Sequence, residues 1–204
     1  MLRILDRYLA EVVERYELCP WARAARLGGE VAAEVLWGAP TEDEWVGAAG
    51  ALLARPGARV AMVIAPELAI APAALRAVRD RVAARLPHAG VADFHPDAAL
   101  DLATPARLVP FLRRAPDPLL QLVPLALLDT VRGAPPALDR ARQAQLLGGR
   151  GAPPRADAAA RIAAANHATA LRHAAEITAA LDDIAADRAA AYARVGIAPR
   201  APIG

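Results

Sequence analysis

Two short segments carry the side chains of this sequence that are best suited to chemistry. Residues 19–21 read Cys-Pro-Trp, and residues 94–96 read Phe-His-Pro. Cys19 is the only cysteine of the chain, and a thiolate serves as a nucleophile or as a metal ligand. His95 adds an imidazole, which serves as a general base or as a ligand to a metal ion. We therefore expect any reaction to take place near these two segments.

The expected setting of Cys19 favours a thiolate. Proline is accepted in the first turn of a helix, so a short helix is expected to begin at Pro20 and to reach Leu27. The thiol would then lie near unpaired backbone N–H groups, at the positive end of the helix dipole. Such a thiolate would act as a nucleophile, or as an axial ligand to haem iron with Trp21 beside the cofactor. The structural alternative is a buried and inert cysteine.

His95 is expected at the carboxyl end of a strand, where α/β proteins place their ligands. Asp93, His95 and Asp97 alternate along the chain, which puts their side chains on one side if the extended backbone continues. His95 and Asp97 also have the spacing of two ligands in an iron facial triad, for which His167 or His173 is a candidate third. The alternative is a histidine that only bonds to backbone at the end of the strand.

Two further groups of polar residues are candidates for binding a substrate. Asn166 and His173 fall on one stripe of the expected C-terminal helix, so that Asn166 would face the substrate and His173 the cofactor. Arg113 and Arg114 precede a proline-rich turn, and the guanidinium fork suits a carboxylate or a phosphate. A solvated helix face and ordinary surface arginines are the structural alternatives.

The composition narrows the class of protein. The chain has 204 residues, of which 56% are hydrophobic, and all 24 basic residues are arginine. The net charge is only +2, and the arginines alternate with acidic residues, which disfavours a nucleic acid as partner. We expect a small-molecule substrate instead.

The expected location is the cytoplasm. The N-terminal residues lack the apolar run and the cleavage site of a signal peptide. No uninterrupted apolar stretch reaches the roughly 18 residues that a membrane-spanning helix needs. A single cysteine forms no internal disulfide, as is usual for a cytoplasmic protein. No membrane partner is expected.

The pattern of apolar residues and breakers predicts the helices and strands that hold these side chains. It indicates an α/β fold, with a small mixed or parallel sheet, flanking helices and a long C-terminal helix. Strand 59–65, helix 72–86 and strand 90–94 follow one another as in a β-α-β unit. Residues 97–132 contain five prolines and are expected to form short helices and turns. Helices are also expected over residues 2–17, 20–27, 41–54 and 157–195, and a further strand over residues 30–37.

The predicted organisation is an α/β domain over residues 1–133 and a connection rich in proline and glycine over residues 134–156. A C-terminal helix over residues 157–196 follows, and it packs on this domain or on a partner. Its alanine-rich face permits close approach of a second helix, so a homodimer is one arrangement that the sequence allows.

Three motifs together resemble a bacterial family, the domain of unknown function 1415. The family has three segments, Leu-Cys-Pro-Phe-Ala, Phe-His-Pro and Arg-Ser-Pro-x-Pro. In the same order and with similar spacing, this chain has residues 16–22 (Tyr-Glu-Leu-Cys-Pro-Trp-Ala), 94–97 (Phe-His-Pro-Asp) and 111–118 (Phe-Leu-Arg-Arg-Ala-Pro-Asp-Pro). The resemblance covers about residues 5–133 and implies no settled activity. After the third motif, the family has His then Leu-Leu-Arg where this chain has Gln121 and Pro124. If that histidine is functional in relatives, this chain is altered, inactive or turned to another substrate.

The function expected from these residues is an iron-dependent oxidoreductase, haem-thiolate or non-haem, that acts on a small molecule. Cys19 is its expected metal ligand, with His95 and Asp97 as further candidates. Two alternatives remain. One is an enzyme in which Cys19 is the nucleophile and His95 the base. The other is a module without turnover that binds a small anion or a partner.

Overall fold

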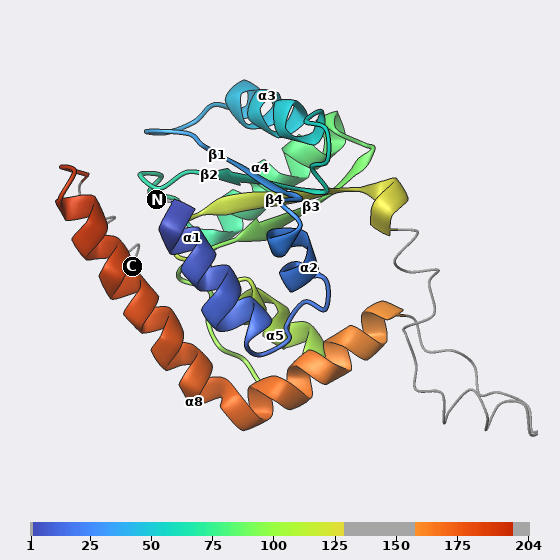
Figure 1. Cartoon of the computed structure of the whole chain (residues 1–204), viewed down its shortest axis with the longest axis vertical. Helices are drawn as coiled ribbons and strands as arrows, with labels where there is room; N and C mark the ends of the chain where they lie inside the picture. The colour runs from blue at the N-terminus through green and yellow to red at the C-terminus, as the bar shows by residue number, and fades with distance from the viewer. Residues whose placement is uncertain (1, 129–157, 198–204) are drawn as a thin grey trace, which may run out of the picture.

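The computed structural model describes residues 2–128 and 158–197 of the chain (Figure 1). The strands of this part are β1 (Val31–Val35), β2 (Val60–Ile64), β3 (Ala89–Phe94) and β4 (Leu119–Pro124). They form one sheet in the order β1-β2-β4-β3. β1 is parallel to β2, whereas β4 is antiparallel to both of its neighbours. The predicted class, a small mixed sheet with flanking helices and a long C-terminal helix, is confirmed.

β4 is the largest difference from the sequence prediction. The prolines of residues 97–132 predict short helices and turns, and this prediction is wrong for residues 119–124. The strand begins directly after Pro118 and ends at Pro124, so the prolines lie at its ends, where a missing N–H group is tolerated. β4 lies between β2 and β3, so these two strands run in the same direction without being neighbours.

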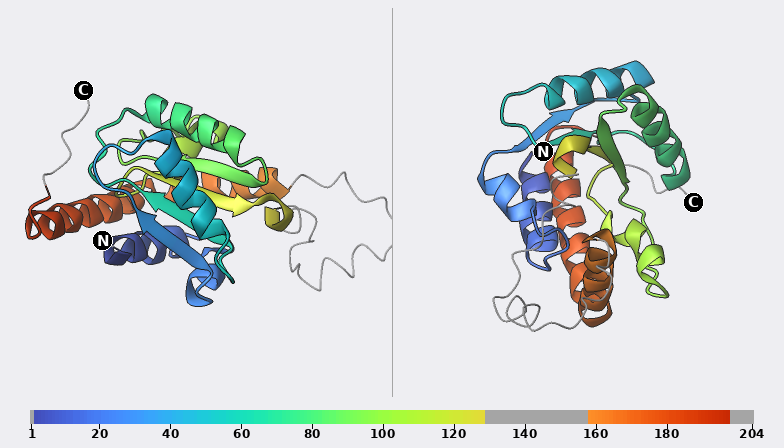
Figure 2. Two further views of the ribbon diagram at one scale, coloured as in Figure 1. Left: turned by 90° about the horizontal axis from the view of Figure 1, so that it is seen from above. Right: turned by 90° about the vertical axis from the view of Figure 1, so that its right-hand side faces the viewer.

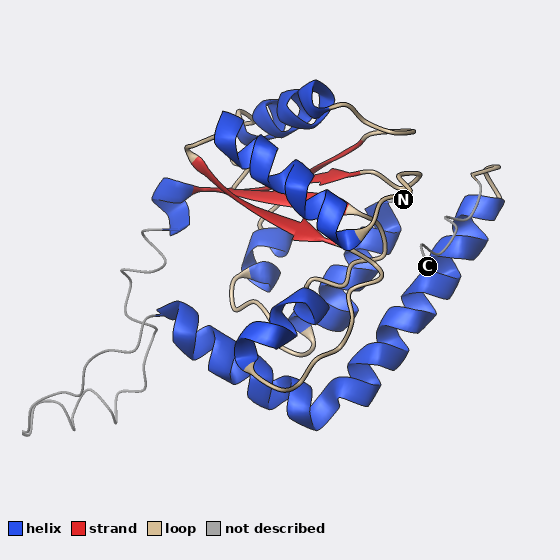
Figure 3. Ribbon diagram, turned by 180° about the vertical axis from the view of Figure 1, so that it is seen from behind, coloured by secondary structure: helices blue, strands red, loops and turns tan. Residues whose placement is uncertain are grey.

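Helices cover both faces of the sheet, which gives three layers (Figure 2). One face carries α3 (Glu42–Leu53) and α4 (Pro72–Arg85). The opposite face carries α1 (Leu2–Tyr8), the π-helical η1 (Leu9–Glu14), α2 (Ala22–Leu27), α5 (Pro105–Leu112) and α8 (Ala158–Ala193). Figure 3 shows the strands between these two layers of helices.

The alternation of side chains along the strands divides the core into two clusters. Ala61 and Val63 of β2 pack toward α3 and α4, whereas Met62 and Ile64 pack toward the helices of the opposite face. A strand that is buried on both faces reads as one continuous apolar run, which is why the sequence predicts β2 so clearly.

Local signals place several helices correctly. The predicted capping box at the start of α3 is present, because the Thr41 side chain accepts from the Glu44 N–H and the Glu44 carboxylate accepts from the Thr41 N–H. Pro72 is the first residue of α4, as predicted. The single amphipathic helix predicted for residues 2–17 is only partly correct, since its second half is π-helical. Such segments are rare and often lie at functional sites.

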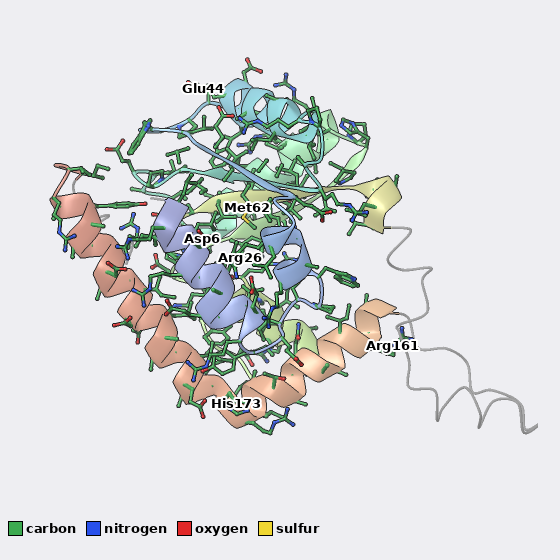
Figure 4. All side chains as sticks on the ribbon, viewed as in Figure 1. Asp6, Arg26, Glu44, Met62, Arg161 and His173 are labelled. Carbon is green, nitrogen blue, oxygen red and sulfur yellow. The ribbon has the colours of Figure 1, made fainter. Side chains whose placement is uncertain are left out.

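α8 packs on its own domain. One side of it, which includes Ala170, Ile177, Leu181 and Ile184, belongs to the core cluster beneath α1 and η1. The helix bends near His173, so that its two halves follow different parts of the domain (Figure 4). Of the described helices, none is long and apolar enough to cross a membrane.

Candidate functional site

A tight turn after η1 positions Cys19. The Leu18 N–H donates to the Val13 carbonyl at 2.9 Å and the Glu17 N–H donates to the Glu14 carbonyl at 3.1 Å, which is the bonding pattern of a Schellman motif. Glycine usually occupies the left-handed position of this motif, but here Glu17 occupies it with φ 52°. A residue with a Cβ atom costs roughly 1–2 kcal/mol in this conformation. Backbone strain therefore lies two residues before the thiol.

The structure does not place Cys19 at a helix start. α2 begins at Ala22 rather than Pro20 and has only six residues, and the Ala22 N–H donates to the Cys19 carbonyl at 3.2 Å. The expected effect of the helix dipole on the thiol is therefore lost. The Cys19 side chain is half-buried against the core, and within the described ranges it makes no hydrogen bond. Trp21, predicted beside a cofactor, is 44% exposed.

Tyr8, which no sequence pattern singles out, belongs to the core cluster against which Cys19 packs. Its side chain is only 2% exposed, and its hydroxyl has no hydrogen-bond partner among the described residues. Burial raises the pKa of Tyr8, the charge of Cys19 raises this pKa further, and the Arg113 guanidinium lowers it. Buried polar groups are normally paired, so the Tyr8 hydroxyl is an exception among the described residues.

Arg113 provides the positive charge near Tyr8. Its carbonyl accepts from the His95 N–H at 3.0 Å, which holds the turn after α5 against the end of β3. Its guanidinium lies 3.8 Å from an Asp93 carboxylate oxygen, which is too long for a hydrogen bond. Burial lowers the pKa of Arg113, Asp93 opposes this shift, and the charges of Arg79 and Arg76 add to it. Positive charge is therefore in excess around this guanidinium.

Three buried side-chain atoms of residues 2–128 and 158–197 make no hydrogen bond, and all three belong to residues whose charges act on the pKa of Arg113. They are Tyr8 Oη, Asp93 Oδ1 and Arg79 Nε. Arg79 Nη1 lies 3.4 Å from Asp93 Oδ1. Arg79 Nε lies 2.9 Å from Asp80 Oδ1, but its N–H is not directed at that oxygen. Incomplete pairing that is confined to one place in a structure is a mark of a functional site.

His95 is tied to the backbone through both of its ring nitrogens. Nδ1 accepts from the Asp97 N–H at 3.0 Å, so the proton resides on Nε2, which donates to the Ile70 carbonyl at 2.8 Å. The Asp97 carboxylate lies 4.0 Å from Nδ1. To act as a base for Cys19 or as an iron ligand, His95 would have to give up one of these bonds. The observed role is to fasten the end of β3 to the segment before α4.

The polar residues of α8 anchor this helix to the rest of the domain. The buried Asn166 amide donates to the Leu18 carbonyl at 3.0 Å, directly beside Cys19. His167 is hydrogen-bonded to the Leu102 carbonyl at 2.9 Å. His173 lies 3.3 Å from Glu176, and its ring centre lies 5.8 Å from that of Tyr16. Asn166 therefore positions the thiol-bearing turn.

The third motif is also held by α8. Arg114 Nε donates to the Pro96 carbonyl at 3.1 Å, and its Nη2 donates to Asp182 at 2.9 Å. Arg114 therefore links the second motif to α8, while the side chain of its neighbour Arg113 is 36% exposed and lies beside Asp93. The sequence analysis also missed a buried cluster in which Asp117 accepts from Arg188 and from the Tyr192 hydroxyl. No local pattern predicts it, because its partners are more than 70 residues apart.

Within the described part of the chain, no three His, Cys, Asp or Glu side chains come close enough together to hold a metal ion. A groove of about 460 Å³ lies between α1, α2 and β1 and does not include Cys19. Asp6 and Arg26 both line this groove (Figure 4). The groove is therefore separate from the cluster around Arg113.

Comparison of the chain with protein-family models, with curated proteins and with solved structures finds no match. The resemblance drawn from the three motifs therefore stays a prediction. At the position where that family has histidine, Gln121 lies in β4 and pairs with Met62 of β2 and Ala92 of β3. Directly paired residues face the same side of a sheet, so the Gln121 side chain faces the layer of α1 and η1.

Proposed function

We propose that this protein binds a small anionic molecule at Tyr8, Cys19 and Arg113, and that Cys19 is the reactive group of this site. The observation that carries the proposal is the buried Tyr8 hydroxyl, which has no hydrogen-bond partner in the described residues; the charge of Cys19 raises its pKa and that of Arg113 lowers it, which supports placing the three groups in one site. A ligand oxygen that accepts from this hydroxyl would end the cost of leaving it unpaired, which is about 1–3 kcal/mol.

Arg113 is suited to hold the charge of such a ligand. Its N–H groups make no hydrogen bond to Asp93 at 3.8 Å, so a bound carboxylate or phosphate has donors available without breaking an existing bond. Guanidinium groups bind these anions through two parallel hydrogen bonds. Burial lowers the pKa of Arg113, Asp93 opposes this shift, and the charges of Arg79 and Arg76 add to it, which supports a negatively charged ligand at this place.

Cys19 is the group that would react with the bound molecule. The thiol is half-buried and makes no hydrogen bond to residues of the described ranges, so a donor or acceptor need not leave before it reacts. A nearby positive group is one of the ways in which proteins activate a thiol nucleophile. This proposal keeps the thiol chemistry predicted for Cys19 and replaces the predicted base, His95, by the charge of Arg113.

Binding of inorganic phosphate and of small carboxylates, measured by titration calorimetry, tests the proposal. Arg113→Gln is expected to weaken binding about 10- to 100-fold, since a charge-assisted hydrogen bond contributes about 1.5–3 kcal/mol. Arg107→Gln is the matched control, because Arg107 is 67% exposed and pairs with Asp101. Equal binding by the wild type and Arg113→Gln, or equal loss in both variants, would contradict the proposal.

Iron ligation by Cys19 is a second candidate function, and the hydrogen-bond-free thiol is the observation that favours it. Iron that is stoichiometric in the purified wild type and absent from Cys19→Ser would support it. A haem-thiolate centre would also show a Soret absorption band. Colourless and iron-free protein, purified from cells supplied with iron, would refute this second candidate while leaving anion binding unaffected.

A further inference from the structure

We infer that this protein forms a homodimer in which β1 of one copy pairs with β1 of a second copy, in the antiparallel direction and centred on Ala33. β1 is an edge strand, because β2 is its only neighbour among the described strands. It lies at the outer border of the sheet (Figure 2). The inference does not depend on the anion site, since none of the residues proposed for that site belongs to this edge.

The outward backbone groups of β1 call for another strand as partner. The Leu36 N–H donates to the Ile64 carbonyl at 2.8 Å, and the Glu30 carbonyl accepts from the Val60 N–H at 3.1 Å. Because the hydrogen-bonding direction alternates along a strand, the even-numbered residues pair with β2. The N–H and C=O groups of the odd-numbered residues of β1 therefore point away from the sheet. Such a row of edge groups is a template for pairing with another chain.

β1 lacks the features that usually protect an edge strand. Natural edges are blocked by lysine, by proline or by a bulge. β1 pairs with β2 in an unbroken register over all five of its residues, and residues 30–37 contain neither lysine nor proline. Its one charged residue, Glu34, lies 4.0 Å from Arg55. The strand is therefore regular and open to pairing along its whole length.

A second copy of β1 satisfies these groups in one particular register. In an antiparallel pair, every second pair of opposite residues exchanges both of its N–H···O bonds. Centring the pair on Ala33 puts Ala33 opposite itself and Val31 opposite Val35, so all three outward-facing residues of both copies are bonded. Glu34 then lies opposite Ala32, and no like charges meet directly. The contact is self-complementary, as a two-fold dimer requires.

The same register gives the exposed Trp37 a place to bind. The odd-numbered residues of β1 pack on the core cluster beneath α1 and η1, so by alternation Trp37 faces this side as well. Trp37 is 55% exposed, and in the dimer it falls opposite Gly29 of the second copy. Gly29 lines the groove of about 460 Å³ between α1, α2 and β1.

The surroundings of Gly29 suit an incoming indole ring. Apart from the residues next to it in the chain, no described atom lies within 4 Å of the place that a Cβ atom of residue 29 would take. Leu27, close by in the chain, is 67% exposed and offers an apolar contact. An unrelated extended peptide would pair with the backbone of β1 but would leave Trp37 uncovered. A second copy covers both, which is why we infer a homodimer.

Sedimentation velocity of the full-length chain, at concentrations from about 1 to 100 µM, tests the inference. We expect a species with twice the mass of the chain. Trp37→Ser should weaken the dimer about 10- to 100-fold, as removal of a buried tryptophan anchor does. Leu171→Ser is the matched control, because Leu171 is 58% exposed and lies on α8, far along the chain from β1. This variant should dimerise like the wild type.

Ala33→Pro tests the pairing of the backbone. It removes the outward N–H at the centre of the contact and keeps the N–H groups that bond to β2, a position at which an edge strand tolerates proline. The dimer should weaken at least about tenfold, since two hydrogen bonds related by the two-fold axis are lost together. Far-UV circular dichroism identifies a variant that fails to fold, and in that case Trp37→Ser alone decides.

The register is tested by Ala33→Cys in a Cys19→Ser background. Opposite residues of a hydrogen-bonded pair have Cα atoms about 5.5 Å apart, which is within the range of a disulfide. Mild oxidation should therefore link two chains through position 33. Val35→Cys in the same background is the control, because the two copies of residue 35 would lie more than about 10 Å apart. Equal cross-linking of the two variants would overturn the register.

Two results would overturn the dimer through β1. A wild type that stays monomeric at about 100 µM would leave the edge to an extended segment of another protein. A dimer that Leu171→Ser dissociates, and that Ala33→Pro and Trp37→Ser leave intact, would place the contact on α8.

Discussion

Tyr8→Phe removes one oxygen atom and keeps the buried ring. We expect this variant to be more stable than the wild type, because folding transfers the Tyr8 hydroxyl from water to a place without a partner in the described residues. Leaving a buried hydroxyl unpaired costs about 1–3 kcal/mol. The ring keeps its contacts with the core, so the free energy of unfolding should rise by about 1 kcal/mol or more. For a chain of this size, about 1 kcal/mol corresponds to a rise in Tm of roughly 2–4 °C.

The matched control is Tyr192→Phe. Tyr192 is also 2% exposed, but its hydroxyl donates to Asp117 at 2.7 Å. Removing this hydroxyl leaves a buried carboxylate with one donor fewer, so the free energy of unfolding should fall by about 1–2 kcal/mol. The same substitution of tyrosine by phenylalanine should therefore raise the free energy of unfolding at Tyr8 and lower it at Tyr192.

Urea denaturation at pH 7.5 and again in buffer above about pH 10 measures both effects. Since burial raises the pKa of Tyr8 above its ordinary value of 10.0, the phenol ionises more readily in the unfolded chain. The stability that this group contributes is present below about pH 10 and falls as the pH rises above it. Tyr8→Phe should therefore lose less stability than the wild type in this range. A Tyr8→Phe variant that is less stable than the wild type at pH 7.5 would refute the reasoning, because the hydroxyl would then have a partner.

Other predictions concern the turn that carries the thiol and the docking of α8. Glu17→Gly should raise the free energy of unfolding by about 0.5 kcal/mol, because the removal of left-handed strain outweighs the greater entropy of glycine in the unfolded chain; a drop in Tm would contradict this. Asn166→Ala should lower the free energy of unfolding by about 1–3 kcal/mol and should speed alkylation of Cys19, because the Leu18 carbonyl loses its partner; an unchanged alkylation rate would show that Asn166 does not hold this turn. Asp187 accepts from Arg3 and Arg7, which lowers its pKa. The stability that it contributes is therefore present above the pKa of an unfolded aspartate and is lost as the pH falls through the lower folded value. Asp187→Asn should flatten the loss of stability below about pH 4, most clearly at low salt, where exposed pairs are least screened; identical acid denaturation curves would argue against the pairing.

Elements with local signals could be predicted from the sequence alone. The apolar run of β2, the capping box of Thr41 and Glu44 and the proline that opens α4 all act within a few residues, so they can be read directly. The long breaker-free stretch from Ala158 likewise predicted α8. Residue type alone also drew attention to Cys19 and Arg113, since a thiol and a guanidinium have a defined chemistry wherever they lie.

The place of β4 and the composition of the candidate site depend on contacts between distant parts of the chain. Leu119, Leu120 and Leu122 form a strand because β4 pairs with β2 along one edge and with β3 along the other, and a window of neighbouring residues does not contain this information. Tyr8 reads as an ordinary core residue on a helix face. Its importance lies in the lack of a hydrogen-bond partner among residues 2–128 and 158–197, and pairing is a property of the assembled interior. The bonds of Asn166 to Leu18 and of Arg188 to Asp117 join residues 148 and 71 positions apart. Whether a buried polar atom is satisfied depends on such distant contacts, and these exist only after the chain has folded.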